Sequence, residues 1–225
     1  MKNHNYSHYV SLGVDCKTRY QIDKVFSGRS FQYEPTKGVF DWLWGAGMNG
    51  VVDMIDNNME IMASNLVVKM IHGIPQVFDN RTGFYFQHDF KFSQEAALSL
   101  SLAHTEMNDQ LNNFHDKYNH LAKKSKSYFV KSHTVCFVYS GALDRNLVER
   151  FHSSIQSTFG SVNFNKPNLL YVVPSNVVVD PNEFDSYNDC IFVRTVDDSA
   201  VKGTPNEWQG DDESWNKVFE GFALV

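Results

Sequence analysis

The residue with the clearest potential for chemistry is Cys16, which follows an apolar stretch and a glycine turn. Residues 8–12 are typical of a strand, Gly13 permits a tight turn, and residues 17–26 carry apolar side chains at helical spacing. A thiol in the first turn of a helix lies near the positive end of the helix dipole and near free backbone N–H groups, which favour a thiolate and an oxyanion. The segment 11–16 therefore predicts a nucleophile. The alternative is a small buried residue that packs the helix onto a sheet.

A cysteine nucleophile needs a base, and His88 is the best candidate. It lies in an otherwise aromatic stretch that indicates the second strand of a β-hairpin over 76–90. A histidine on a rigid strand can accept the thiol proton, although a structural histidine is the alternative. Asp89 follows directly, and strand alternation would place it on the opposite face unless a bulge intervenes.

Asp41 is a second carboxylate of interest, because it stands between two large aromatic residues, Phe40 and Trp42. A carboxylate in such surroundings is partly buried and needs donors or a charge partner. It can cap the turn that follows, orient His88, or bind a substrate amine or hydroxyl. The residues expected to contact a substrate lie beside the nucleophile and beside this motif: Gly13, Asp15 and Trp42.

The elements that would position these residues follow from hydrophobic periodicity. A long helix with an unbroken apolar stripe follows Ser93, which we expect to cap it. The last third alternates continuous apolar strands with a helix, which predicts a sheet buried on both faces with parallel strand pairs. Asp211 or Asp212 would cap a short closing helix, and the acidic, aromatic segment 208–215 either forms that cap or lines the site. The predicted strands and helix of this third are residues 134–139, 144–159, 169–173 and 190–194.

Composition limits the class of protein. The 225 residues suit one domain over 1–225, and a net charge of −6 argues against a nucleic-acid partner. No apolar stretch reaches the ~20 residues of a membrane helix, and the polar N-terminus lacks a secretory signal. Three cysteines at wide spacing form neither a disulfide framework nor a metal knuckle, so we expect a reducing, cytoplasmic setting. No phosphate loop, dinucleotide fingerprint or metal-ligand spacing is present, and no cofactor or metal is predicted.

Three short motifs in order, residues 11–16, 40–42 and 88–90, resemble those of a family described as papain-like cysteine peptidases of unknown function. The resemblance spans nearly the whole chain and includes the tryptophan-to-aspartate segment 208–211. It implies that Cys16 is the nucleophile, that His88 is the general base, and that Asp89 or Asp41 orients the imidazole. It also implies an α+β papain-like fold. The periodicity instead favours a layered α/β fold with a strand–Cys–helix turn, a hairpin carrying His88 and a C-terminal β–α–β part.

The leading hypothesis is thus a thiol-dependent hydrolase or peptidase in which Cys16 forms an acyl-enzyme and His88 moves the proton. Two alternatives remain open. One is an acyl- or group-transferase that uses the same site on surface polysaccharide. The other is a non-catalytic binding module in which Cys16 is structural. The expected partner is a peptide, acyl or glycan substrate, with no nucleic acid or membrane.

Overall fold

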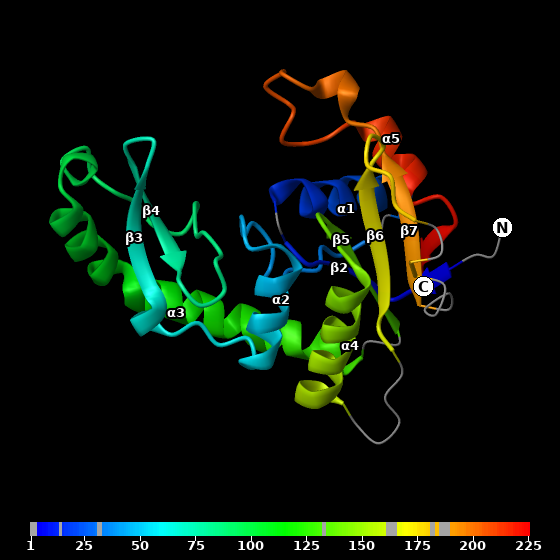
Figure 1. Ribbon diagram of the computed structural model, residues 1–225, viewed down its shortest axis with the longest axis horizontal. Coiled ribbons are helices and arrows are strands. Elements are labelled where there is room, and N and C mark those ends of the chain that lie inside the picture. Colours follow the sequence, from blue (N-terminus) through cyan, green and yellow to red (C-terminus); the bar gives the residue numbers. More distant parts are fainter. Residues whose placement is uncertain are drawn as a thin grey trace.

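Four parallel strands form the central sheet of a computed structural model that describes residues 4–13, 15–30, 33–131, 134–160, 166–180, 183–184 and 190–225 (Figure 1). Each strand bonds its neighbour in parallel register, with Val10 opposite Phe137 and Leu170 opposite both Val138 and Phe192. The two middle strands are almost wholly buried, as continuous apolar sequences require. The order of the four strands across the sheet is β2 (His8–Ser11), β5 (Val135–Ser140), β6 (Asn168–Pro174) and β7 (Ile191–Val196).

Helices cover both faces of this sheet, because alternate strand residues point to opposite sides. Cys136 and Val138 face a cluster that includes side chains of α1 (Cys16–Arg29) and α5 (Asp212–Val218). Phe137 and Tyr139 face the other cluster, which includes α2 (Gly47–Asp56), α4 (Arg145–Phe159) and one end of α3 (Leu100–Val130). The predicted layered α/β fold is therefore confirmed, and this parallel sheet is not the α+β papain-like alternative.

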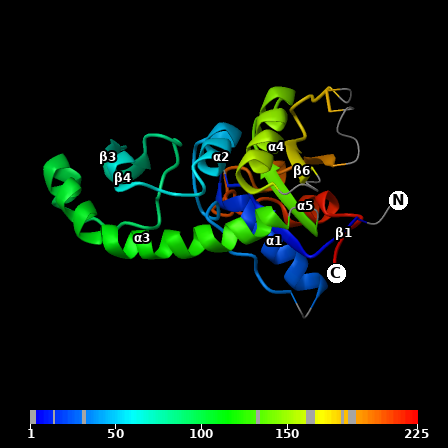
Figure 2. The same ribbon diagram turned by 90° about the horizontal axis from the view of Figure 1, so that it is seen from below.

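A smaller lobe lies beside the sheet, at the far end of α3 (Figures 1 and 2). It contains the antiparallel hairpin of β3 (Leu66–Ile71) and β4 (Ile74–Asp79). His72 and Gly73 join these strands, and both have positive φ, as a tight two-residue hairpin turn requires. Buried side chains of this hairpin share an apolar cluster with α3, which therefore connects the lobe to the sheet.

The remaining elements complete the two ends of the chain and its turns. The parallel pair β1 (His4–Tyr6) and β8 (Phe222–Leu224) brings the first and last described segments together (Figure 1). Short 3-10 turns are η1 (Ala63–Asn65), η2 (Ala96–Leu98) and η5 (Ser199–Val201). In the part of the chain described, no helix is both long and apolar enough to cross a membrane.

Two predicted element boundaries differ from the structure. The long helix is capped by Ser99, whereas the Ser93 hydroxyl accepts the Ala96 N–H at the start of η2. The hairpin predicted over 76–90 is also shorter, since its second arm pairs only around Tyr85. The Asp89 N–H bonds the Phe86 carbonyl, so the chain turns there and His88 lies in a turn rather than on a strand.

Candidate active site

Cys16 is the first residue of α1 and lies just beyond the carboxyl end of β2. Asp15 caps the helix: one carboxylate oxygen accepts the backbone N–H groups of Lys17, at 3.0 Å, and Thr18, at 3.3 Å. These two donors are therefore engaged and not free for an oxyanion, contrary to the expectation from the sequence. The backbone N–H of Cys16 bonds no acceptor within the described residues.

The Cys16 thiol has two partners from other segments. Its Sγ lies 3.8 Å from His88 Nε2 and accepts the Trp44 indole N–H at 3.3 Å. Cys16 is only 7% exposed, and this burial raises the pKa of its thiol; the Trp44 hydrogen bond opposes the shift, and the Asp15 carboxylate adds to it. This shift favours the thiol over the thiolate, so ionisation needs a base, and His88 lies within reach to act as one.

Trp44 and His88 reach the thiol through one backbone pairing. Tyr85 donates its N–H to the Trp44 carbonyl at 2.9 Å, and Trp44 donates to the Tyr85 carbonyl at 3.4 Å. Gly45 has φ +104°, and a Cβ there would stand 2.5 Å from the Tyr85 ring, so only glycine fits this approach. The imidazole itself packs edge-on against the Trp42 ring.

The two predicted orienting acids are engaged elsewhere. The Asp89 carboxylate accepts the Tyr118 hydroxyl at 2.9 Å and pairs with Lys117, so it faces α3. Asp41 is buried and accepts the Gly38 N–H at 2.8 Å; burial raises the pKa of this carboxyl to about 6, although Arg19 opposes the shift. Among the described residues, no carboxylate bonds the His88 imidazole.

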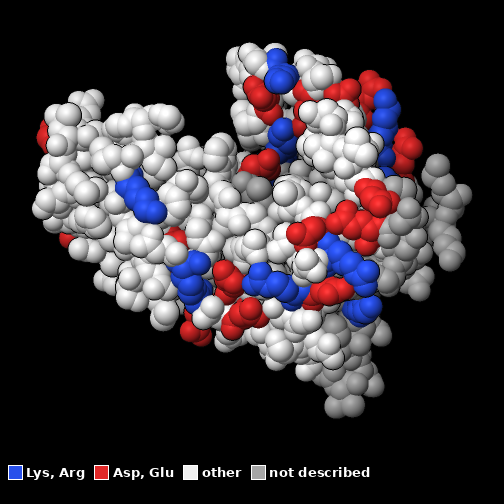
Figure 3. Space-filling view, in the orientation of Figure 1, with Lys and Arg blue, Asp and Glu red and all other residues white. Residues whose placement is uncertain are grey.

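A cavity of about 730 Å³ opens beside the thiol, in the hollow between the hairpin lobe and the segment 197–211 (Figure 3). Three of the four tryptophans of the chain line it, each between 41% and 47% exposed. Flat, half-exposed aromatic faces of this kind are suited to hold a ligand. The lining residues are Asp15, Cys16, Lys17, Trp42, Trp44, Gln87, His88, Thr204, Pro205, Glu207 and Trp208.

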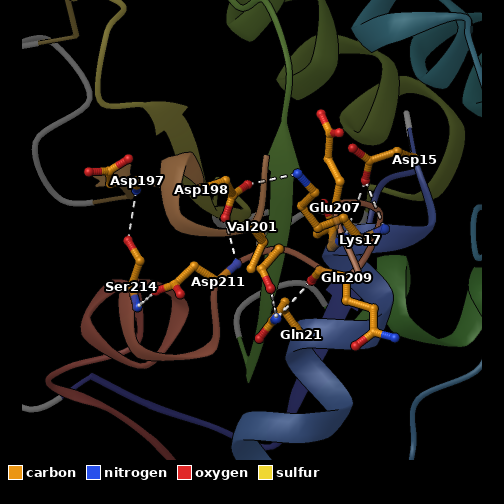
Figure 4. Close-up of polar contacts among 12 residues, drawn as sticks. Asp15, Lys17, Gln21, Asp197, Asp198, Val201, Glu207, Gln209, Asp211 and Ser214 are labelled. Atoms are coloured by element: carbon orange, nitrogen blue, oxygen red, sulfur yellow. Dashed lines mark hydrogen bonds and ion pairs between the residues drawn. The ribbon is translucent and has the colours of Figure 1, made fainter. Parts of the chain in front are cut away.

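Polar contacts hold the segment 197–211 against α1 (Figure 4). Lys17 Nζ bonds one Asp198 oxygen at 2.7 Å, and the other Asp198 oxygen accepts the Asp211 N–H at 2.8 Å. Gln21 donates to the Gln209 carbonyl at 2.7 Å. These contacts place the Trp208 ring edge-on against Tyr20, where it forms a wall of the cavity.

The predicted contact residues thus divide into two groups. Asp15 and Trp42 line the cavity, and the segment 208–215 fills both predicted roles, because Asp211 caps α5 while Trp208 lines the cavity. Gly13 does not line it: its φ is +80°, and a Cβ there would stand 3.0 Å from the Phe40 carbonyl, so it serves the turn.

Sequence reasoning missed several residues of this site. Trp44, Gln87 and Glu207 line the cavity, yet none belongs to a chemical motif. The one available signal was that Trp44 precedes a glycine in an aromatic stretch. The other two cysteines are fully buried (Cys136) or nearly so (Cys190, 7% exposed), and burial raises the pKa of the Cys136 thiol.

Within the described ranges, no group of three or more histidine, cysteine or acidic side chains could hold a metal ion. No protein-family model, curated protein or solved structure matches the chain.

Proposed function

We propose that this protein is a thiol-dependent acyl-transfer hydrolase in which Cys16 is the nucleophile and His88 the general base. The observation that carries the proposal is the 3.8 Å approach of Cys16 Sγ to His88 Nε2 at the wall of an open cavity. His88 accepts the thiol proton as Sγ bonds a substrate carbonyl carbon, and returns it to the leaving group. Water then attacks the thioester, His88 accepts the proton of that water, and the thiol and a carboxylic acid are released.

Trp44 supplies a donor in addition to the first turn of the helix. Two N–H groups of the first turn are taken by Asp15, while the Trp44 indole N–H points at Sγ. This hydrogen bond stabilises the thiolate against the cost of burial. Together with the backbone N–H of Cys16, which bonds no acceptor in the described part of the chain, it provides two donors beside the position of a developing oxyanion.

This chemistry does not require a carboxylate as a third catalytic residue. A thiol is far more acidic than a serine hydroxyl, so a histidine within reach is enough to generate the thiolate. The T-shaped contact with the Trp42 ring would orient the imidazole in place of an acid. We therefore assign Cys16 and His88 as a dyad, with Asp89 and Asp41 as structural residues.

The test is the rate at which iodoacetamide alkylates each cysteine of the native protein between pH 5 and 10, read by peptide mass spectrometry. We expect Cys16 to react much faster than Cys136 and Cys190, and His88→Ala to remove most of this advantage. Equal rates at the three cysteines would contradict the proposal and support a non-catalytic binding module.

A second candidate, an acyl- or group-transferase with a glycan acceptor, is favoured by the tryptophans. Trp42, Trp44 and Trp208 present half-exposed rings to the cavity, and such faces suit the apolar sides of sugar rings. An acceptor hydroxyl would then replace water in the second step. Product analysis with and without an oligosaccharide acceptor separates the two reactions, since only a transferase forms an acylated sugar.

A further inference from the structure

Two more cavities adjoin the one at Cys16 and continue it along the hairpin lobe. The first, of about 350 Å³, shares Trp44 and Gln87 with the Cys16 cavity. The second, of about 310 Å³, shares Ile74, Gln76 and Gln87 with the first. The shared lining residues place the three cavities next to one another, in a row from the thiol past β4. We call the two further cavities the hairpin groove.

The hairpin groove differs in charge from the cavity at the thiol. Neither of its cavities is lined by a lysine, arginine, aspartate or glutamate, whereas Asp15, Lys17 and Glu207 line the Cys16 cavity. Figure 3 shows the same contrast, with few charged side chains on the hairpin lobe and many around the sheet. The lining is instead apolar and aromatic, with Ile71, Ile74, Pro75, Tyr85, Phe90 and Phe92.

Glutamine amides interrupt this apolar lining. Gln76, Gln87 and Gln94 line the hairpin groove, and within the described residues their side chains bond no other group. An amide both donates and accepts, so it can pair with a peptide N–H or C=O, whereas an alkyl chain offers neither. Apart from His72, no side chain of this lining could act as a counter-ion, so a charged segment would lose hydration here with little compensation.

We propose that the hairpin groove binds an extended, uncharged polypeptide segment with apolar side chains, whose scissile carbonyl lies at Cys16. The proposal rests on the proposed function and specifies its substrate class. Ile74 is 58% exposed at the end of the hairpin, and it lines both cavities of the groove. Pro75 lacks an N–H group, which limits strand addition at this edge, so the side-chain cavities and the glutamine amides hold the peptide.

The experiment compares four electrophiles as alkylating agents of Cys16. They are iodoacetamide, acetyl-Leu-Val-Ala chloromethyl ketone, its acetyl-Asp-Asp-Ala counterpart and a decyl chloromethyl ketone. The rate of each reagent is divided by the iodoacetamide rate of the same protein. We expect this relative rate to be at least about tenfold higher for the apolar peptide than for the acidic peptide. Ile74→Asp should reduce this preference about tenfold and leave the iodoacetamide rate unchanged.

Two further variants test whether the preference depends on the lining of the hairpin groove. Met70→Asp places the same charge on the same hairpin, at an exposed residue that lines neither cavity, and should leave the preference unchanged. Gln94→Ala removes one exposed amide. It should slow the alkylation of Cys16 by the apolar peptide and leave the rates of the other reagents unchanged.

The outcomes separate this proposal from the proposed function. If Cys16 reacts with iodoacetamide but shows no preference for the apolar peptide, the groove proposal is overturned and the function stands. A faster reaction with the decyl compound than with the peptide would assign the groove to an acyl chain and also overturn it. If Cys16 is inert toward iodoacetamide, the proposed function fails, and the groove proposal fails with it.

Discussion

The two walls of the candidate site are built in different ways. The thiol wall is one continuous stretch, in which β2 leads through Gly13 and the Asp15 cap into Cys16 of α1. The imidazole wall consists of two stretches, around Trp44 and His88, that one backbone pairing joins. The first wall is held by local bonds and the buried sheet, and the second by a long-range contact at the surface. Nucleophile and base therefore depend on different parts of the fold.

The largest expected effect comes from removing the base. His88→Ala should slow alkylation of Cys16 at pH 7 by about a hundredfold, because a thiol whose pKa burial has raised then lacks a proton acceptor. Peptide mass spectrometry measures the rate, and an unchanged melting temperature shows that the fold is intact. A rate equal to that of the native protein would mean that the imidazole does not assist the thiol.

Gly45→Ala tests the pairing that holds the imidazole wall. The new methyl group meets the Tyr85 ring at a φ of +104°, so we expect a loss of about 2–4 kcal/mol in the free energy of unfolding. Gly203→Ala is the matched control: its φ is +75°, but nothing lies within 4 Å of the added Cβ, and about 1 kcal/mol should be lost. Urea unfolding measures the free energy of unfolding of both variants. Equal losses would show that the contact with the Tyr85 ring adds nothing to the cost of the positive φ.

The buried Asp41 carboxyl should make the stability of the protein depend on pH. Its pKa is raised from 3.8 to about 6 in the folded protein, so between these values the folded state binds more protons than the unfolded state. Stability should therefore fall as pH rises from 4 to 7, on the order of 2–3 kcal/mol for this group.

Asp41→Asn should remove that part of the pH dependence, whereas Asp116→Asn, at an exposed position of α3, should retain it. Urea unfolding at several pH values gives the comparison. Parallel stability curves for Asp41→Asn and the native protein would show that this carboxyl does not titrate in the folded protein.

The smallest expected effect comes from removing the Trp44 indole N–H, which donates a hydrogen bond to the Cys16 thiol. Trp44→Phe keeps an aromatic ring but removes the N–H bond to Sγ, so the pKa of the Cys16 thiol should rise and alkylation at pH 7 should slow by about three- to tenfold. Trp42→Phe alters a ring that contacts His88 but not Sγ, and should leave the midpoint of the pH–rate profile unchanged. A shift of equal size in both variants would point to the cavity lining rather than the donor.

Much of the fold could be predicted from periodicity, because continuous apolar strands are stable only when both faces are covered. The helix caps show the limit of such local signals. Asp211 caps α5 as predicted, but Ser93 and Ser99 are equally good caps in sequence, and only packing placed the start of α3 after Ser99. Likewise, the aromatic stretch before His88 is typical of a strand, yet it pairs only around Tyr85 before it turns.

By itself the sequence determined where the thiol lies, since a strand, a glycine turn and a capping aspartate are local features with local causes. The tertiary structure decided what the thiol meets. The pairing of Trp44 with Tyr85 brings the indole and the imidazole to Cys16, and the bonds of Asp89 with α3 turn its carboxylate away. The Lys17–Asp198 ion pair helps to hold the segment that carries Trp208 to the cavity. Such contacts join residues far apart in the chain, and their free energy depends on the folded neighbours of each residue rather than on its type.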